Sequence, residues 1–144
     1  MVSAQDVLSN YNGKYVVIRA KEGFKYELGQ DIDILCKDIT NLTRHLLLCG
    51  YGYVLLGYEI KVSHSEEHKH IDFLFQNKLD IRFDLIDSFY GFANHILETA
   101  IEQEGIKLPR PNADLATRLM EYAEKDKAKH REYVKIHLNE SSID

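Results

Sequence analysis

The chain has 144 residues, a mass of 16.7 kDa and a formal net charge of −5, which is the size of one domain and excludes a second substrate domain of ordinary size. Its 44% hydrophobic and 28% charged residues are typical of a folded protein with a sizeable core. The acidic balance offers no general attraction to nucleic acid or to an anionic membrane. No apolar run approaches the roughly 20 residues that span a bilayer, and no secretory signal opens the sequence. We therefore expect a cytoplasmic protein with neither a membrane nor a nucleic acid as partner.

Strand-like segments dominate the first 87 residues. Short apolar runs rich in β-branched residues predict five strands: 15–20, 31–36, 53–62, 70–76 and 79–87. Acidic and aliphatic residues alternate in the second of these, as expected for a strand with one polar and one buried face. Asn77 and Lys78 stand between the last two segments and predict a hairpin turn.

Helical spacing of apolar residues marks the other parts of the chain. A short helix is predicted to begin after Ser3, and a longer one after Asp38, with Gly50 and Gly52 at its end. Beyond Asp87 the apolar residues keep a spacing of three to four, which predicts a helical tail. Its helices are expected over 89–105, 112–122 and 133–138.

These elements together predict a single α+β domain over residues 1–144. A small mixed or antiparallel sheet with flanking helices would form a core of about 11–88, and a C-terminal helical tail of about 89–138 would pack beside it.

The strongest local signal for chemistry is a pair of carboxylates on one strand, Asp31 and Asp33. Side chains of a strand alternate, so the two acids share a face and lie roughly 6–7 Å apart, while Ile32 and Ile34 anchor the backbone in the core. Two like charges repel each other unless a cation lies between them, and a hard divalent cation takes carboxylate oxygens. The alternative interpretation is an edge strand with a solvated acidic face.

A second acid-rich strand supports the interpretation of the first as part of a cation site. Asp80, Arg82 and Asp84 alternate along the segment 79–87 and are predicted to share a face. Asp84 is our predicted third carboxylate of the site, and Asp72 on the preceding strand is the alternative third ligand. Three acids around one point can hold two divalent ions and stabilise phosphoryl or nucleotidyl transfer.

The order of these elements resembles the nucleotidyltransferase superfamily of the polymerase-beta type, and most closely a bacterial branch linked to surface-polysaccharide biosynthesis. The resemblance covers most of residues 15–87 and is carried by the segments YVVIR, DIDIL and IRFDLID at 15–19, 31–35 and 81–87. It implies a nucleotidyltransferase-like fold in which Asp31, Asp33 and Asp84 are catalytic and hold Mg²⁺ or Mn²⁺.

One departure from the family pattern concerns phosphate binding. The superfamily usually carries a Gly-Ser or Gly-Gly pair after the first strand, whereas Arg19-Ala20-Lys21 stands at that place here. Arg19 and Lys21 are therefore expected to bind phosphate through their side chains, since guanidinium pairs bidentately with phosphate.

The resemblance implies an enzyme, a Mg-dependent nucleotidyltransferase. It would move a nucleoside monophosphate from a nucleoside triphosphate to a small acceptor such as a sugar phosphate, or to a protein. The alternative is a non-catalytic nucleotide- or metal-binding module with a degenerate nucleotidyltransferase fold, which the missing Gly-Ser pair motivates. The small size argues against a polymerase, which needs further domains to grip a template.

Three histidines within seven residues, His64, His68 and His70, stand outside this scheme. Imidazole suits zinc, copper or nickel, but the spacing matches no recognised metal motif. We expect an exposed loop between strands here, and the sequence leaves open a metal site or a substrate-binding role for His68 or His70 at the rim of the site.

Overall fold

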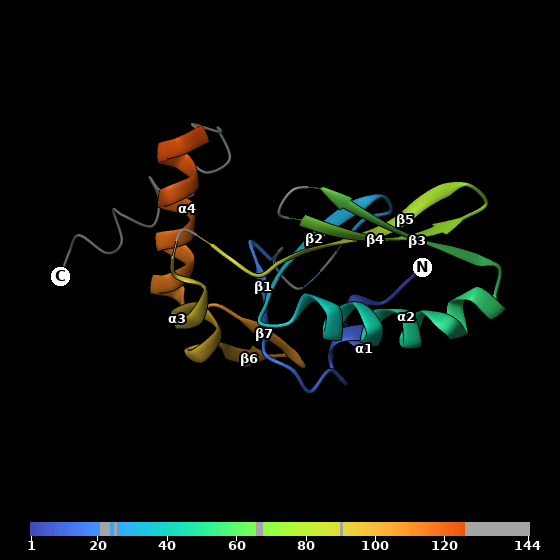
Figure 1. The fold of residues 1–144 in the computed structure, drawn as a ribbon, viewed down its shortest axis with the longest axis horizontal. Helices are drawn as coiled ribbons and strands as arrows, with labels where there is room; N and C mark the ends of the chain where they lie inside the picture. The colour runs from blue at the N-terminus through green and yellow to red at the C-terminus, as the bar shows by residue number, and fades with distance from the viewer. Residues whose placement is uncertain (21–23, 25, 66–67, 90, 126–144) are drawn as a thin grey trace.

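The computed structural model describes residues 1–20, 24, 26–65, 68–89 and 91–125 of the chain (Figure 1). In this part the fold is α+β, as the sequence predicts, with a mixed five-stranded sheet, a small two-stranded sheet and four helices. None of the helices in the described ranges combines the length and the apolar character that crossing a bilayer requires.

The main sheet has the strand order β1-β2-β5-β4-β3. Its strands are β1 Tyr15–Ile18, β2 Gln30–Cys36, β3 Tyr58–Ser65, β4 His68–Phe75 and β5 Lys78–Ile86. Neighbouring strands are antiparallel except β2 and β5, which are parallel. This parallel pair lies in the middle of the sheet and carries both acid-rich segments.

The described helices are α1 Ala4–Leu8, α2 Ile39–Leu55, α3 Ala93–Glu98 and α4 Pro111–Lys125. Ser3 caps α1 and Asp38 caps α2, each by accepting a backbone N–H of the first turn, which confirms both predicted helix starts. The second sheet is a hairpin of β6 Ile101–Gln103 and β7 Ile106–Leu108.

The two faces of the main sheet differ in what covers them. One face, which we call the covered face, packs against α1 and α2 (Figure 1). It buries the main core, in which Ile32, Ile34, Phe73 and Phe83 are almost fully inaccessible. At the β1 end of the other face, a smaller apolar cluster joins β1 and β2 to α3. The remainder of that second face, which we call the open face, carries the polar side chains of Asp31, Asp33, His68, His70, Asp72, Arg82 and Asp84.

The end of α2 differs from the prediction. The helix continues through Gly50 and Gly52 to Leu55, so the predicted strand over 53–62 begins only at Tyr58. A Cβ on Gly50 would lie 2.3 Å from Cδ1 of Ile60 and 3.1 Å from Cζ of Phe73. This glycine therefore serves close packing of the helix on the sheet rather than helix termination.

The region 89–105 also differs, because it is not one helix. The helix α3 is short, and residues 101–108 form the β6–β7 hairpin, whose turn places Glu104 at φ 54° and Gly105 at φ 82°. The backbone N–H of Lys107 on β7 donates to the Tyr15 hydroxyl on β1 at 3.3 Å, which ties this hairpin to the main sheet.

Two further boundaries are corrected. The β4–β5 turn is formed by Gln76 and Asn77 at φ 52° and 65° rather than by Asn77 and Lys78. Positive φ at both central residues is the geometry that suits a two-residue hairpin. The helix α4 begins at Pro111, not Asn112, since proline fits the first helical turn. The helix predicted over 133–138 lies outside the described residues.

Candidate functional site

Two acids from separate segments lie side by side in the middle of the open face. Asp33 on β2 stands opposite Asp84 on β5 in the parallel register, which brings the two carboxyl groups next to each other. Asp31 is two residues away on the same face of β2 and is exposed to solvent. The structure therefore brings two of the three predicted carboxylates into contact and leaves the third beside them.

The pKa of Asp33 is raised above the usual carboxyl value. Burial contributes most, the Arg19 guanidinium opposes the rise, and the negative charges of Asp84 and Asp31 add to it. A bound cation at this point would relieve both the repulsion and the desolvation.

Arg19 lies at the edge of this acid pair. It follows β1 with φ 55°, a left-handed conformation rare for a residue with a side chain, and its guanidinium reaches Asp33 at 3.3 Å. The same guanidinium also pairs with Glu121 of α4. The predicted phosphate ligand is thus at the site, held between two carboxylates, whereas Lys21 lies outside the described residues.

Asp72, the alternative third ligand, has a different partner. Its two oxygens accept bidentate hydrogen bonds from Arg82 at 2.7 and 2.9 Å. Arg82 stands opposite Asp31 in the β2–β5 register, so its positive charge separates Asp72 from the β2 acids. Asp84, rather than Asp72, lies against Asp33.

Asp80 does not share a face with Asp84, contrary to the sequence prediction. A β-bulge where β4 shifts register between Phe73 and Leu74 breaks the alternation of β5 at this point. The Asp80 carboxylate is buried on the covered face, where it accepts the Tyr58 hydroxyl at 2.7 Å and the Val2 backbone N–H at 3.3 and 3.4 Å.

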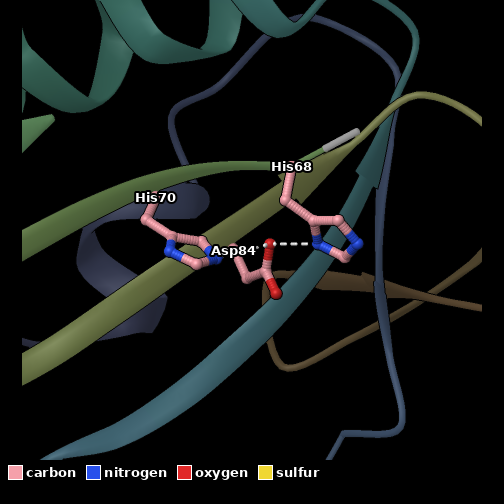
Figure 2. Close-up of side chains that lie close together, drawn as sticks. All are labelled: His68, His70 and Asp84. Atoms are coloured by element: carbon pink, nitrogen blue, oxygen red, sulfur yellow. Dashed lines mark hydrogen bonds and ion pairs between the residues drawn. The ribbon is translucent and has the colours of Figure 1, made fainter. Parts of the chain in front are cut away.

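His64 and His68 lie on strands and not in the loop that we expected between strands, and His70 lies on the strand that the sequence predicts. His68 and His70 belong to β4, and both rings turn toward Asp84 (Figure 2). His68 Nδ1 is 2.8 Å and His70 Nε2 is 3.4 Å from the same oxygen, Oδ1 of Asp84. His64 is on β3, paired with Lys69, which places it on the opposite face of the sheet.

A signal for the two histidines was present in the sequence. The period-two alternation of Ile71 and Phe73 extends back through Lys69, so His68 and His70 belong to the polar face that also carries Asp72. Strand prediction that began at His70 missed this continuation because charged and imidazole residues are weak strand formers.

The arrangement offers two kinds of metal ligand around one residue. Asp31, Asp33 and Asp84 supply carboxylate oxygens, the donors that Mg²⁺ and Mn²⁺ prefer. His68 and His70 supply imidazole nitrogens on the other side of Asp84. Asp84 is common to both sets.

No protein-family model and no curated protein matches this sequence. Among solved structures, the chain is similar to the one titled "Crystal structure of JHP933 from Helicobacter pylori", with 9% sequence identity and a TM-score of 0.48 over 78% of this chain. The chain spans about half of that structure, 51% of its length. A likeness of this degree carries no statement about activity.

Proposed function

We propose that the protein is a divalent-metal-dependent nucleotidyltransferase that moves a nucleoside monophosphate from a nucleoside triphosphate to a small acceptor, such as a sugar phosphate, or to a protein. The observation that carries the proposal is the in-register contact of Asp33 with Asp84 on adjacent parallel strands, with Asp31 on the same face. The resemblance of the segments around these acids to nucleotidyltransferases supplies the reaction class.

The donor set fits a hard divalent cation. Asp31, Asp33 and Asp84 offer only oxygen ligands, and the pKa of Asp33 is raised by burial and, to a smaller degree, by the negative charges of Asp84 and Asp31. These three residues would hold the ion. Bound there, Mg²⁺ or Mn²⁺ would neutralise charge on the phosphates and lower the pKa of the attacking hydroxyl.

The remaining residues of the site have roles that follow from their contacts. Arg19 would bind a phosphate oxygen through its guanidinium, and Glu121 on α4 would hold that guanidinium in position. Asp84 would accept the proton of the acceptor hydroxyl, since it faces Asp33 and is mostly buried on a rigid strand.

A non-catalytic nucleotide- or metal-binding module is the second candidate. The observation in its favour is the engagement of Arg19 by Asp33 and Glu121 together, in a chain without the Gly-Ser phosphate-binding pair. Phosphate would have to displace a carboxylate from this arginine before it could bind.

Pyrophosphate release separates the two candidates. The protein is incubated with each of the four nucleoside triphosphates and Mg²⁺ or Mn²⁺, alongside Asp33→Asn and a matched control, Asp72→Asn. Both variants replace one open-face acid by its amide, but only the first removes a proposed metal ligand. We expect release to fall by roughly a hundredfold or more in Asp33→Asn and to stay within about threefold of wild type in Asp72→Asn.

Binding measured in parallel completes the test. Metal-dependent nucleotide binding without pyrophosphate release, in the presence of a sugar-phosphate mixture as acceptor, would favour the binding module. Absence of both binding and release with all four nucleotides would overturn the nucleotidyltransferase proposal.

A further inference from the structure

His68 and His70 have a geometry that the proposed nucleotidyl transfer does not require. We propose that His68, His70 and Asp84 form a binding site for a transition-metal dication of the zinc class. This inference depends on three ligand residues alone and stands whether or not the protein transfers nucleotides.

The ligand atoms are already gathered. One nitrogen from each histidine and a carboxylate oxygen of Asp84 all lie within 4.8 Å of one another. The two nitrogen–oxygen separations are 2.8 and 3.4 Å. Bonds of about 2.0–2.2 Å to a tetrahedral zinc ion place neighbouring ligand atoms roughly 3.3 Å apart. Small rotations of the two rings therefore suffice to admit an ion.

The backbone that presents these ligands is rigid. His70 stands directly opposite Asp84 in the antiparallel register of β4 and β5, and His68 lies two residues away on the same face. The adjacent residues on the other face, Ile71 next to His70 on β4 and Phe83 next to Asp84 on β5, are fully buried in the main core. A site on two packed strands keeps its ligand positions before the ion arrives, which favours affinity.

The donor set selects the class of ion. Two imidazoles and one carboxylate suit Zn²⁺, Co²⁺ or Ni²⁺ and disfavour Mg²⁺, which prefers oxygen ligands. Three protein ligands leave one tetrahedral position for water or substrate, which is the pattern of open zinc sites. The side chain of His68 is 45% exposed, that of His70 25% and that of Asp84 13%, so an ion can enter from solvent.

A neighbouring acid adds to the negative charge of the site. Asp33 stands opposite Asp84 on the adjacent parallel strand, on the side away from the two histidines. Negative charge next to a ligand set favours the binding of a dication.

Zinc binding to tag-free, chelator-treated protein tests the site. Isothermal titration with Zn²⁺ is performed without nucleotide and without other divalent cations, because Mg²⁺ bound at the carboxylates would compete for Asp84. We expect one equivalent of Zn²⁺ to bind, with affinity lowered at least tenfold in His68→Ala and in His70→Ala. His64→Ala is the matched control, because it removes a histidine from the same hairpin on the other face of the sheet. It should bind Zn²⁺ like wild type.

Cobalt gives an independent readout of the ligands. Co²⁺ bound to the wild type should show the intense visible absorption of a low-coordinate site with nitrogen ligands, and His70→Ala should lose it. Equal Zn²⁺ affinity in all three histidine variants, or no Zn²⁺ binding by the wild type, would overturn the inference. If the protein binds Zn²⁺ but releases no pyrophosphate, the zinc-site inference stands and only the nucleotidyltransferase proposal is contradicted.

Discussion

The two faces of the main sheet differ in the partners that surround their acidic side chains. On the covered face, Asp80 is only 5% exposed, and it accepts hydrogen bonds from the Tyr58 hydroxyl and the Val2 backbone. On the open face, Asp33 and Asp84 lie against each other, with Arg19 beside Asp33 and His68 beside Asp84. An acid with built-in hydrogen-bond donors stabilises the fold, whereas two acids that face each other repel and depend on cationic neighbours or a bound cation.

Two pKa shifts show the same contrast, that of Tyr58 on the covered face and that of Asp33 on the open face. Burial and the hydrogen bond to Asp80 raise the pKa of Tyr58 to about 12, so this hydroxyl keeps its proton and remains a donor. Burial and negative neighbours raise the pKa of Asp33, so that carboxyl resists ionisation. The shift at Tyr58 preserves a structural contact, and the shift at Asp33 marks a buried carboxyl group with other acids beside it.

The largest expected effect comes from exchanging each acid for its amide. Asp80→Asn replaces a charged acceptor of three hydrogen bonds by an amide that must turn an N–H toward one of the donors. We expect the free energy of unfolding to fall by about 2 kcal/mol, as measured by urea denaturation at pH 7. Asp33→Asn should be as stable as wild type or more so, because it removes a repelling charge. Equal losses in the two variants would contradict the difference between the faces.

The pH dependence of stability sharpens the same contrast. A carboxyl whose pKa is raised in the folded state makes the protein less stable as pH rises from the ordinary carboxyl pKa to the raised one. The wild type should therefore lose stability relative to Asp33→Asn between about pH 4 and neutrality. Urea denaturation across this range gives the difference, and added Mn²⁺ should reduce it. A difference that is independent of pH would show that Asp33 titrates normally.

Gly50 and Gly52 lie on different sides of α2. Gly50 packs against the covered face of the sheet, and Gly52 does not. Gly52→Ala meets nothing within 4 Å and should stabilise the protein by about 0.5–1 kcal/mol, since alanine favours helix. Gly50→Ala gains the same propensity but presses on Ile60 and Phe73, which costs roughly 1 kcal/mol or more. Thermal unfolding should place Gly50→Ala below Gly52→Ala. The reverse order would refute the close packing at Gly50.

The smallest effect is expected at the ion pair of the open face. Arg82→Met removes the bidentate partner of Asp72, whose surroundings remain partly solvated. Pairs of this kind contribute at most about 1 kcal/mol, so urea denaturation should show a loss within that limit and a smaller one at high salt. A loss as large as that of Asp80→Asn would mean that the open face is as structural as the covered one.

Local chemistry predicted the elements whose signals lie within a few residues. The caps at Ser3 and Asp38, the strand around Asp31 and Asp33, and the α+β class all follow from side-chain alternation and capping. The failures at Gly50 and at 101–108 arise from tertiary contacts. In sequence, a glycine that lets a helix approach a sheet cannot be distinguished from a glycine that ends the helix. A three-residue strand is too short for its alternation to be recognised.

The candidate site was predictable to the same depth. Strand periodicity assigned Asp31, Asp33 and Asp84 to polar faces, but which strand pairs with which is decided by packing, not by periodicity. The bulge that turns Asp80 to the covered face, and the salt bridge that occupies Asp72, also depend on neighbouring strands. The contact of Arg19 with Glu121 joins residues 102 positions apart, which no local pattern announces.

The parallel pairing of β2 with β5 also sets when this site can exist during synthesis. Antiparallel neighbours can form as soon as a turn leaves the ribosome, but a parallel pair must wait for the intervening chain. Here that chain is α2 and the β3–β4 hairpin, which stand between Asp33 and Asp84 in sequence. In a nascent chain that ends before β5, the acidic strand β2 can therefore pair with β1 alone, and its acids meet Asp84 only once β5, the last of the five strands in sequence, has been made.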